Sequence, residues 1–413
     1  MNPRKNYVAA VGFTRREGLI ALIGGIATLS GCGGGGGSSG LLGSIASVGS
    51  GGTGSFSSGA ITGFGSIIVN GVRFDDSKAT ITDDDGVSHN SGDLKLGMVV
   101  SVTGSTVVVG TTGSSATANT ITFGSELRGP IDSIGSQSLV VLGQTVQIGT
   151  NTVFDNAIVG GLAGLSVGQT IEVDGFVDPA ANTIQATRIE RTGNTNEFKL
   201  QGVVQALNTT AKTFTIGALT ISYAGIATTD LPALANGLLV RVRLATTPAT
   251  GTRTATRIRA VAREVEERDE AELEGTVTAF TSTSTFSVNG VAVDAGKASF
   301  PNGSAGLRLG ARVEVEGTVT NGVVVATTVK VENEAEVENQ EFELHGTVSN
   351  LNTTNKTFVI RGVTVSFAGT VRFDKGDAST LATVNGTTAI VEVKGTNNAA
   401  TNSVTATRIS FDN

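Results

Sequence analysis

Apolar and polar residues alternate in short runs along most of the chain after residue 59, and glycine-containing turns separate these runs. In the run Phe286–Val293, for example, the alternation continues on both sides of Asn289-Gly290. A period of two places one face of a strand in a core and the other in water. Asn-Gly favours the positive φ angles of a type I′ turn. The pattern therefore predicts a β-hairpin, and similar runs predict hairpins in Ile68–Val72, Leu139–Ile148, Phe214–Ile221 and Phe358–Val365.

Three motifs surround each predicted hairpin and always occur in the same order. The first is an apolar-x-Gly motif, with its glycine at Gly63, Gly129, Gly202, Gly275 and Gly346. The second is a V-x-V-x-G run, which ends at Gly104, Gly175, Gly317 and Gly395 but at Leu244 in the third copy. The third is an Ala-Thr-x-Ile run ending at Ile189, Ile258 and Ile409, with looser versions ending at Ile121 and Val329. A constant order of motifs in five registers indicates five tandem copies.

The motifs therefore predict five strands in each copy: one at the first motif, two in the hairpin, one at V-x-V-x-G and a closing strand at the Ala-Thr-x-Ile run. Five strands in a unit of this size are typical of a small Greek-key barrel of the OB type. The alternative is an immunoglobulin-like sandwich, which needs about seven strands and about 100 residues. We predict an all-β chain of five such barrels in tandem.

The first 31 residues follow a different pattern, that of an export signal. Basic residues precede the apolar run Leu19–Leu29, and the segment ends in Leu29-Ser30-Gly31-Cys32. A basic stretch, a short apolar run and small residues before a cleavage site describe a secretory signal. A run of about eleven apolar residues is too short to span a bilayer as a helix. The cleavage site also resembles the lipobox of bacterial lipoproteins, which implies lipidation of Cys32; a plain signal peptide with an incidental cysteine is the alternative. Arg15-Arg16 leaves export by the twin-arginine route open.

Composition adds limits on partners and on the segment after Cys32. Residues 32–58 are mostly Gly and Ser, which predicts a disordered tether. The single cysteine excludes an internal disulfide. The formal net charge of −7 argues against binding to a phosphate backbone, and the absence of Trp argues against stacking on nucleic-acid bases. We therefore expect no nucleic-acid partner.

The chain divides into a signal peptide, a tether and five barrels. The predicted ranges are 1–31, 32–58, 59–124, 125–192, 193–262, 263–332 and 333–413. Tandem copies of the three motifs behind a lipobox and a glycine run resemble the bacterial domain-of-unknown-function family 5666, most closely in copies two, four and five. The resemblance implies OB-like β-barrel repeats of secreted or lipid-anchored proteins, and it supplies no catalytic residues.

Few residues are candidates for chemistry. The run Asp83-Asp84-Asp85-Gly86 resembles a metal loop, but Ile81 and Gly92 occupy the first and last ligand positions of an EF-hand, so we interpret the run as a hairpin tip. His345 is expected to be an exposed strand residue, and Asp155 and Asp374 are expected to be matching turn residues. No catalytic triad, metal-ligand set or phosphate loop appears in the sequence. We therefore expect no catalytic residue, no bound metal, no cofactor and no enzyme activity.

Charged residues offer two further hypotheses. The acidic joins Arg263–Glu274 and Glu332–Glu343 predict solvated strand or spacer segments; weak divalent-cation binding is the alternative. Arg188, Arg257 and Arg408 share one position of the closing strand, and Lys330 lies nearby in the fourth copy. These four cations predict either a basic ribbon that binds an anionic glycan or lipid head group, or an ordinary exposed strand face.

The sequence favours a non-catalytic, lipid-anchored protein of the cell envelope whose barrels serve for display or interaction. The expected location is the outer membrane of a Gram-negative bacterium, and the expected partners are the membrane and an envelope polysaccharide or protein. The alternative is an array that binds anionic envelope polysaccharide or lipid head groups through Arg188, Arg257, Lys330 and Arg408.

Overall fold

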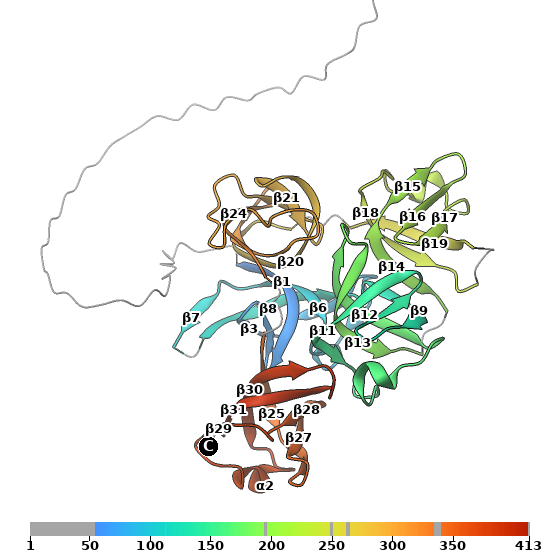
Figure 1. The fold of residues 1–413 in the computed structure, drawn as a ribbon. Coiled ribbons are helices and arrows are strands. Elements are labelled where there is room, and N and C mark those ends of the chain that lie inside the picture. Colours follow the sequence, from blue (N-terminus) through green and yellow to red (C-terminus); the bar gives the residue numbers. More distant parts are fainter. Residues whose placement is uncertain are drawn as a thin grey trace, which may run out of the picture. The chain divides into compact units, whose positions relative to one another are not determined.

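The computed structural model describes residues 54–411 apart from 112, 194–195, 248–250, 262–264 and 334–339. The predicted signal peptide with Leu29, Ser30 and Gly31, the lipidation site Cys32 and almost all of the predicted tether lie outside the described residues. Strands make up nearly all the regular structure of the described residues (Figure 1). In this part of the chain, no helix has the length and the apolar character needed to cross a membrane.

The second copy has the simplest barrel. Its strands are β9 (Leu127–Ile134), β10 (Ser138–Val141), β11 (Gln144–Phe154), β12 (Thr170–Asp178) and β13 (Thr183–Arg191). β9 pairs with β10, β10 with β11, β11 in parallel with β13, β13 with β12, and β12 again with β9. This circuit closes a five-stranded Greek-key barrel of the OB type, so the predicted fold class is confirmed.

The other four copies close in the same order, and we number the barrels 1–5 along the chain. Barrel 1 contains β1 (Ser55–Phe64), β2 (Ile67–Val69), β3 (Val72–Asp75), β4 (Thr80–Asp83), β5 (Ser88–His89), β6 (Val99–Gly104), β7 (Val108–Gly110) and β8 (Gly113–Phe123). Barrel 3 contains β14 (Phe198–Val203), β15 (Gln205–Asn208), β16 (Thr213–Ile216), β17 (Leu219–Ser222), β18 (Leu239–Leu244) and β19 (Arg253–Ala260). Barrel 4 contains β20 (Arg268–Ser282), β21 (Thr285–Val288), β22 (Val291–Asp294), β23 (Arg312–Thr320) and β24 (Val323–Val331). Barrel 5 contains β25 (Glu341–Thr347), β26 (Ser349–Asn352), β27 (Thr357–Ile360), β28 (Val363–Ser366), β29 (Arg372–Asp374), the short helix α2 (Thr380–Val384), β30 (Ile390–Asn398) and β31 (Ser403–Phe411).

The glycine of the V-x-V-x-G motif marks a β-bulge. The pairing of β12 with β13 shifts register between Asp174 and Gly175. A Cβ atom on Gly175 would lie 2.2 Å from the carbonyl oxygen of Gln185, which is closer than any side chain tolerates. The same approach recurs at Gly317 and Gly395. Barrel 3 keeps the bulge but has the buried Leu244 at this position.

The apolar cores extend beyond single barrels. One cluster includes Phe74 of barrel 1 and Phe358 of barrel 5, and a second includes Phe154 of barrel 2 and Phe214 of barrel 3. Phe56 of β1 belongs to the cluster that fills barrel 4. Complete burial of such a side chain contributes about 1.5–3 kcal/mol. The barrels are therefore joined by shared apolar packing as well as by the chain.

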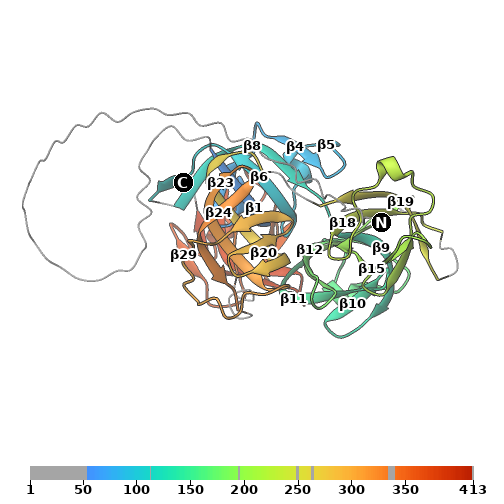
Figure 2. The same cartoon turned by 90° about the horizontal axis from the view of Figure 1, so that it is seen from above.

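The structure corrects the predicted boundary between the tether and the first barrel. β1 begins at Ser55, inside the segment predicted as tether. Residues Ser55–Ser58 pair antiparallel with β6 on one side and parallel with β20 of barrel 4 on the other (Figures 1 and 2). Backbone hydrogen bonds do not depend on side chains, so a Gly/Ser composition does not prevent strand formation where both edges find partners. The acidic join before barrel 4 likewise contains the start of β20.

Candidate functional site

Each of the four cations predicted to bind a ligand has a carboxylate partner within the protein. Arg188 is 4% exposed and donates from Nη2 to Asp155 Oδ2 at 2.8 Å and to Glu190 Oε2 at 3.0 Å. The remaining three pair with acids as well: Arg257 with Asp85, Lys330 with Glu314 and Arg408 with Asp374. The four cations belong to four different barrels, and the structure does not bring them together in one group.

Two of these pairs are the same contact in two barrels. Asp155 directly follows β11, whose Phe154 lies beside Ile189 of β13; Asp374 ends β29, whose Phe373 lies beside Ile409 of β31. Asp155 forms an ion pair with Arg188, which precedes Ile189. Asp374 forms an ion pair with Arg408, which precedes Ile409. The hydrogen bond that Arg408 donates is the main cause of the lowered pKa of Asp374. In both barrels, the arginine of the closing strand therefore holds the segment that precedes the fourth strand against the barrel.

The acidic run of barrel 1 is a hairpin tip, as predicted, but its partners were not predicted. β4 and β5 form the hairpin, and Asp83 Oδ1 accepts hydrogen bonds from the backbone N–H groups of Asp85 and Val87, both at 2.9 Å. Asp84 and Asp85, which we call the acidic tip, reach barrel 3. Asp84 is ion-paired with Lys199, Arg241 and Arg243, and Asp85 with Arg243 and Arg257.

These four cations, which we call the cationic socket, come from three adjacent strands of barrel 3. Lys199 of β14 lies opposite Arg243 of β18, and Arg243 lies opposite Arg257 of β19. The residues Lys199 and Arg243 are 3% and 4% exposed, and the side chain of Asp84 is 8% exposed. Burial lowers the pKa of Lys199, and the charge of Asp84 opposes that shift. The socket and the acidic tip thus form a desolvated ion cluster between barrels 1 and 3.

Barrel 1 also contacts barrel 5 through a group with metal-ligand chemistry. One ligand atom from each of Glu343, His345 and Glu392 lies within 4.8 Å of the others. His345 lies on a strand, as predicted, but its side chain is only 19% exposed, because Arg73 of barrel 1 approaches its Nε2 atom to 3.1 Å. Burial alone would raise the pKa of Glu343, but hydrogen bonds from His345 and Lys394 and the charge of Arg73 lower it to about 2. Because two cations already neutralise Glu343, the group is better suited to joining the barrels than to holding a metal.

Barrel 1 covers an acidic face of barrel 4 as well. Ser57 of β1 lies beside Glu272 of β20, and Asn70 Nδ2 donates to the Glu272 carbonyl oxygen at 3.2 Å. Burial, together with the negative charges of Glu314, Glu316 and Glu274, raises the pKa of Glu272 to about 9. This contact therefore places a protonated carboxyl group beside β1 at neutral pH.

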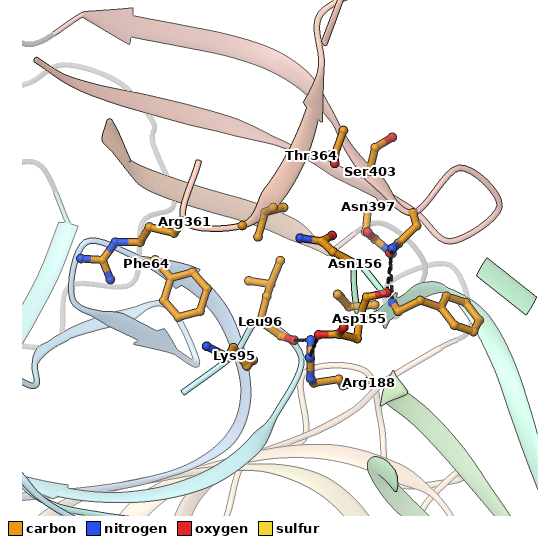
Figure 3. A pocket seen from close by; sticks show the side chains of 15 residues that line it. Phe64, Lys95, Leu96, Asp155, Asn156, Arg188, Arg361, Thr364, Asn397 and Ser403 are labelled. Carbon is orange, nitrogen blue, oxygen red and sulfur yellow. Dashed lines mark hydrogen bonds and ion pairs between the residues drawn. The ribbon is translucent and has the colours of Figure 1, made fainter. Parts of the chain in front are cut away.

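A small cavity lies where barrels 1, 2 and 5 meet (Figure 3). Its volume is about 180 Å³. Lys95 and Arg361 lie near Phe64 at one end, and the Arg361 guanidinium is 5.8 Å from the centre of the Phe64 ring. Much of the polar lining is engaged in the contact between barrels: Asn397 Nδ2 donates to the carbonyl oxygens of Thr150 and Thr152 at 2.9 and 3.0 Å, and Arg188 Nη1 donates to the carbonyl oxygen of Leu96 at 3.4 Å.

Fold and contacts together define a protein of tandem OB-like β-barrels joined by polar contacts between barrels. The chain belongs to the family described as "Domain of unknown function (DUF5666)", whose model matches residues 128–190, 201–259, 274–330 and 345–410. These ranges correspond to barrels 2–5.

The comparison with curated proteins found no match. Among solved structures, the chain is similar to one described as "drosophila Unr CSD456", with 15% identity over 50% of this chain and 97% of that chain and a TM-score of 0.13.

Proposed function

We propose that this protein is a non-catalytic scaffold of the bacterial cell envelope, held at a membrane by a lipid on Cys32. The tandem OB-like barrels of this family support a scaffold or binding role. The observation that carries the scaffold proposal is that barrel 1 contacts each of the other four barrels. It does so through β-pairing with β20 and β25, through the acidic tip in barrel 3, and through the Leu96 carbonyl that accepts from Arg188 in barrel 2.

The pairing of the closing-strand cations favours the scaffold over the polysaccharide array. A free basic ribbon requires arginines with hydrogen-bond donors available to an anion. Here each of the four proposed cations already contacts a carboxylate, and Arg188 is buried between barrels 1 and 2. Two of these contacts join barrels: Arg257 pairs with Asp85 of barrel 1, and Arg188 donates to the Leu96 carbonyl oxygen of barrel 1, whereas the ion pairs of Lys330 and Arg408 lie within one barrel.

The anchoring part of the proposal rests on the sequence Leu29-Ser30-Gly31-Cys32. We expect Cys32→Ala to move the protein from the membrane fraction to the soluble fraction of the envelope, because a lipidated thiol supplies the proposed anchor. Immunoblots of both fractions measure the shift. The substitution Ser38→Ala in the neighbouring Gly/Ser segment is the control and should leave the distribution unchanged. Retention of the Cys32→Ala protein in the membrane fraction would contradict lipid anchoring.

A further inference from the structure

We propose that the cationic socket of barrel 3 is a binding site for an acidic polypeptide segment with adjacent carboxylates, and that the acidic tip of barrel 1 occupies it as an internal ligand. The socket consists of Lys199, Arg241, Arg243 and Arg257. This proposal goes beyond the scaffold function and does not depend on it.

The arrangement of the socket requires an anion. Lys199, Arg243 and Arg257 form one row across three neighbouring strands, with Arg243 directly opposite each of the other two. Like charges directly opposite each other destabilise a sheet. Two members of the row are also almost fully buried, and removal of the partner of a buried charge is strongly destabilising. A vacated socket would therefore gain free energy by taking up negative charge from elsewhere.

The internal ligand indicates the chemistry of the segment that fits. Asp84 contacts Lys199, Arg241 and Arg243, whereas Asp85 contacts Arg243 and Arg257. Two successive carboxylates thus divide the socket, and Arg243 contacts both. A single carboxylate in the position of Asp84 would contact three of the cations but not Arg257. The socket carries four cations; among the described residues, the acids that pair with them are the two tip residues and Glu197, whose Oε2 lies 3.7 Å from Arg243 Nε. The excess of positive charge suits a segment with more carboxylates than the tip provides.

The acidic tip can leave the socket without opening barrel 1. It lies on the β4–β5 hairpin, which is additional to the five strands that close the barrel. β5 has two residues and pairs only with β4 among the described strands, whereas β4 also pairs in parallel with β8 as far as Asp83. β1, β2, β3, β6 and β8 close the barrel without the hairpin. An external acidic segment therefore competes with the turn between β4 and β5, which begins directly after the β4 residues that pair with β8, and not with the strands that close the barrel.

The test compares the full chain with its Asp84→Asn/Asp85→Asn variant. The probe is a fluorescent peptide with the sequence of residues 80–89, and its analogue with Asn at the three aspartates is the control peptide. Fluorescence anisotropy at low salt measures binding. We expect the variant to bind the acidic peptide at least tenfold more tightly than the unsubstituted protein does. We expect no binding of the Asn analogue. Added salt should weaken the binding, and Arg243→Gln in the same background should abolish it.

A charge-matched control is Asp76→Asn/Asp230→Asn, which removes two carboxylates outside the contacts of the socket. It should bind the peptide no better than the unsubstituted protein. Equal binding by the Asp84→Asn/Asp85→Asn variant and the unsubstituted protein would overturn the proposal. Binding that survives Arg243→Gln, or a preference for a single-stranded oligonucleotide over the peptide, would also overturn it. If circular dichroism shows that the double variant is unfolded, Asp85→Asn alone, which retains Asp84, must give a smaller gain, and no gain would refute the proposal.

Discussion

Barrels 1 and 4 have the same strand order but differ in the side chains on the outer face of their first strand. In β1, the segment next to barrel 4 reads Ser55-Phe56-Ser57-Ser58, whereas the paired segment of β20 reads Glu270-Ala271-Glu272-Leu273. Small hydroxyl side chains leave room for a second strand alongside the first. Long carboxylates normally extend into water and keep neighbours away. β20 nevertheless pairs with β1, so carboxylates on a first strand do not prevent another barrel from docking, and Glu272 is covered in its protonated form instead.

The first strand of barrel 1 accounts for its contacts with barrels 4 and 5. Its first strand is buried along its whole length, between its own strands and those of barrels 4 and 5. The first strands of barrels 3 and 4 instead carry charged residues such as Lys199 and Glu272, which need partners of opposite charge or a proton when another barrel covers them. Barrel 1 provides the Asp84 carboxylate as the partner of Lys199. Beside Glu272 it provides uncharged residues such as Ser57.

The largest effect should come from titration of Glu272. Its pKa is about 9 in the folded protein against 4.5 for the free group, so the folded state binds an additional proton between these values. Stability should therefore fall as pH rises from about 4.5 to about 9, with each unit of pKa difference worth about 1.4 kcal/mol. Glu272→Gln replaces the carboxyl with a neutral amide of the same shape. We expect the variant to lose this part of the pH dependence and to be the more stable protein at pH 9, as measured by urea unfolding across the pH range.

Glu341→Gln is the matched control, since Glu341 is an exposed carboxylate on the first strand of barrel 5. It should leave the slope of stability against pH unchanged. If Glu272→Gln and the unsubstituted protein show the same slope between pH 5 and 9, the carboxyl beside β1 is ionised in the fold and the described contact is incorrect.

A smaller effect should follow from adding one carbon atom to β1 where barrel 5 approaches. A Cβ on Gly63 would lie 2.3 Å from the carbonyl oxygen of Glu343 in barrel 5 and 2.7 Å from Ile68 Cδ1. Overpacking of this kind costs about 1–3 kcal/mol, so Gly63→Ala should lower the free energy of unfolding by that amount. Gly92→Ala is the control, because a Cβ there meets no atom within 4 Å. Equal stability of the two variants would show that β1 is not packed against barrel 5.

Much of the fold could be predicted because its determinants are local. The alternation on both sides of Asn289-Gly290 and the equivalent runs specify a hairpin in each copy, and both of these turn residues have positive φ, at 48° and 83°. The V-x-V-x-G glycines could be recognised as a repeat, although their role at a bulge emerges only when β12 and β13 lie side by side. The strands that close each barrel and their order thus follow from patterns of a few residues, whereas additional strands such as β4, β5 and β7 of barrel 1 were not predicted.

The contacts between barrels could not be predicted from the same patterns. The phase of the closing strand places Arg188 away from the core of its own barrel, and we expected it to face an anion or water. In the structure, barrel 1 covers it, and a Cβ on Gly97 would lie 3.1 Å from the Arg188 Cβ. Period-two alternation tells which face leaves the barrel's own core, but not what lies on the other side. The acidic tip is a similar case: Asp84 and Lys199 are far apart in sequence, and no local motif selects one among many acids as the partner of that lysine.

Specific contacts of barrel 1 hold barrels 2–5 together. A double-mutant cycle with Asp84→Asn and Lys199→Gln in the full chain tests this claim most directly, because the two residues lie in barrels 1 and 3 and both side chains are almost fully buried. Free energies of unfolding for the four proteins, measured in urea, give the coupling between the two sites. We expect a coupling energy of about 0.5–3 kcal/mol, typical of residues in direct contact. Additive effects, with a coupling indistinguishable from zero, would contradict it.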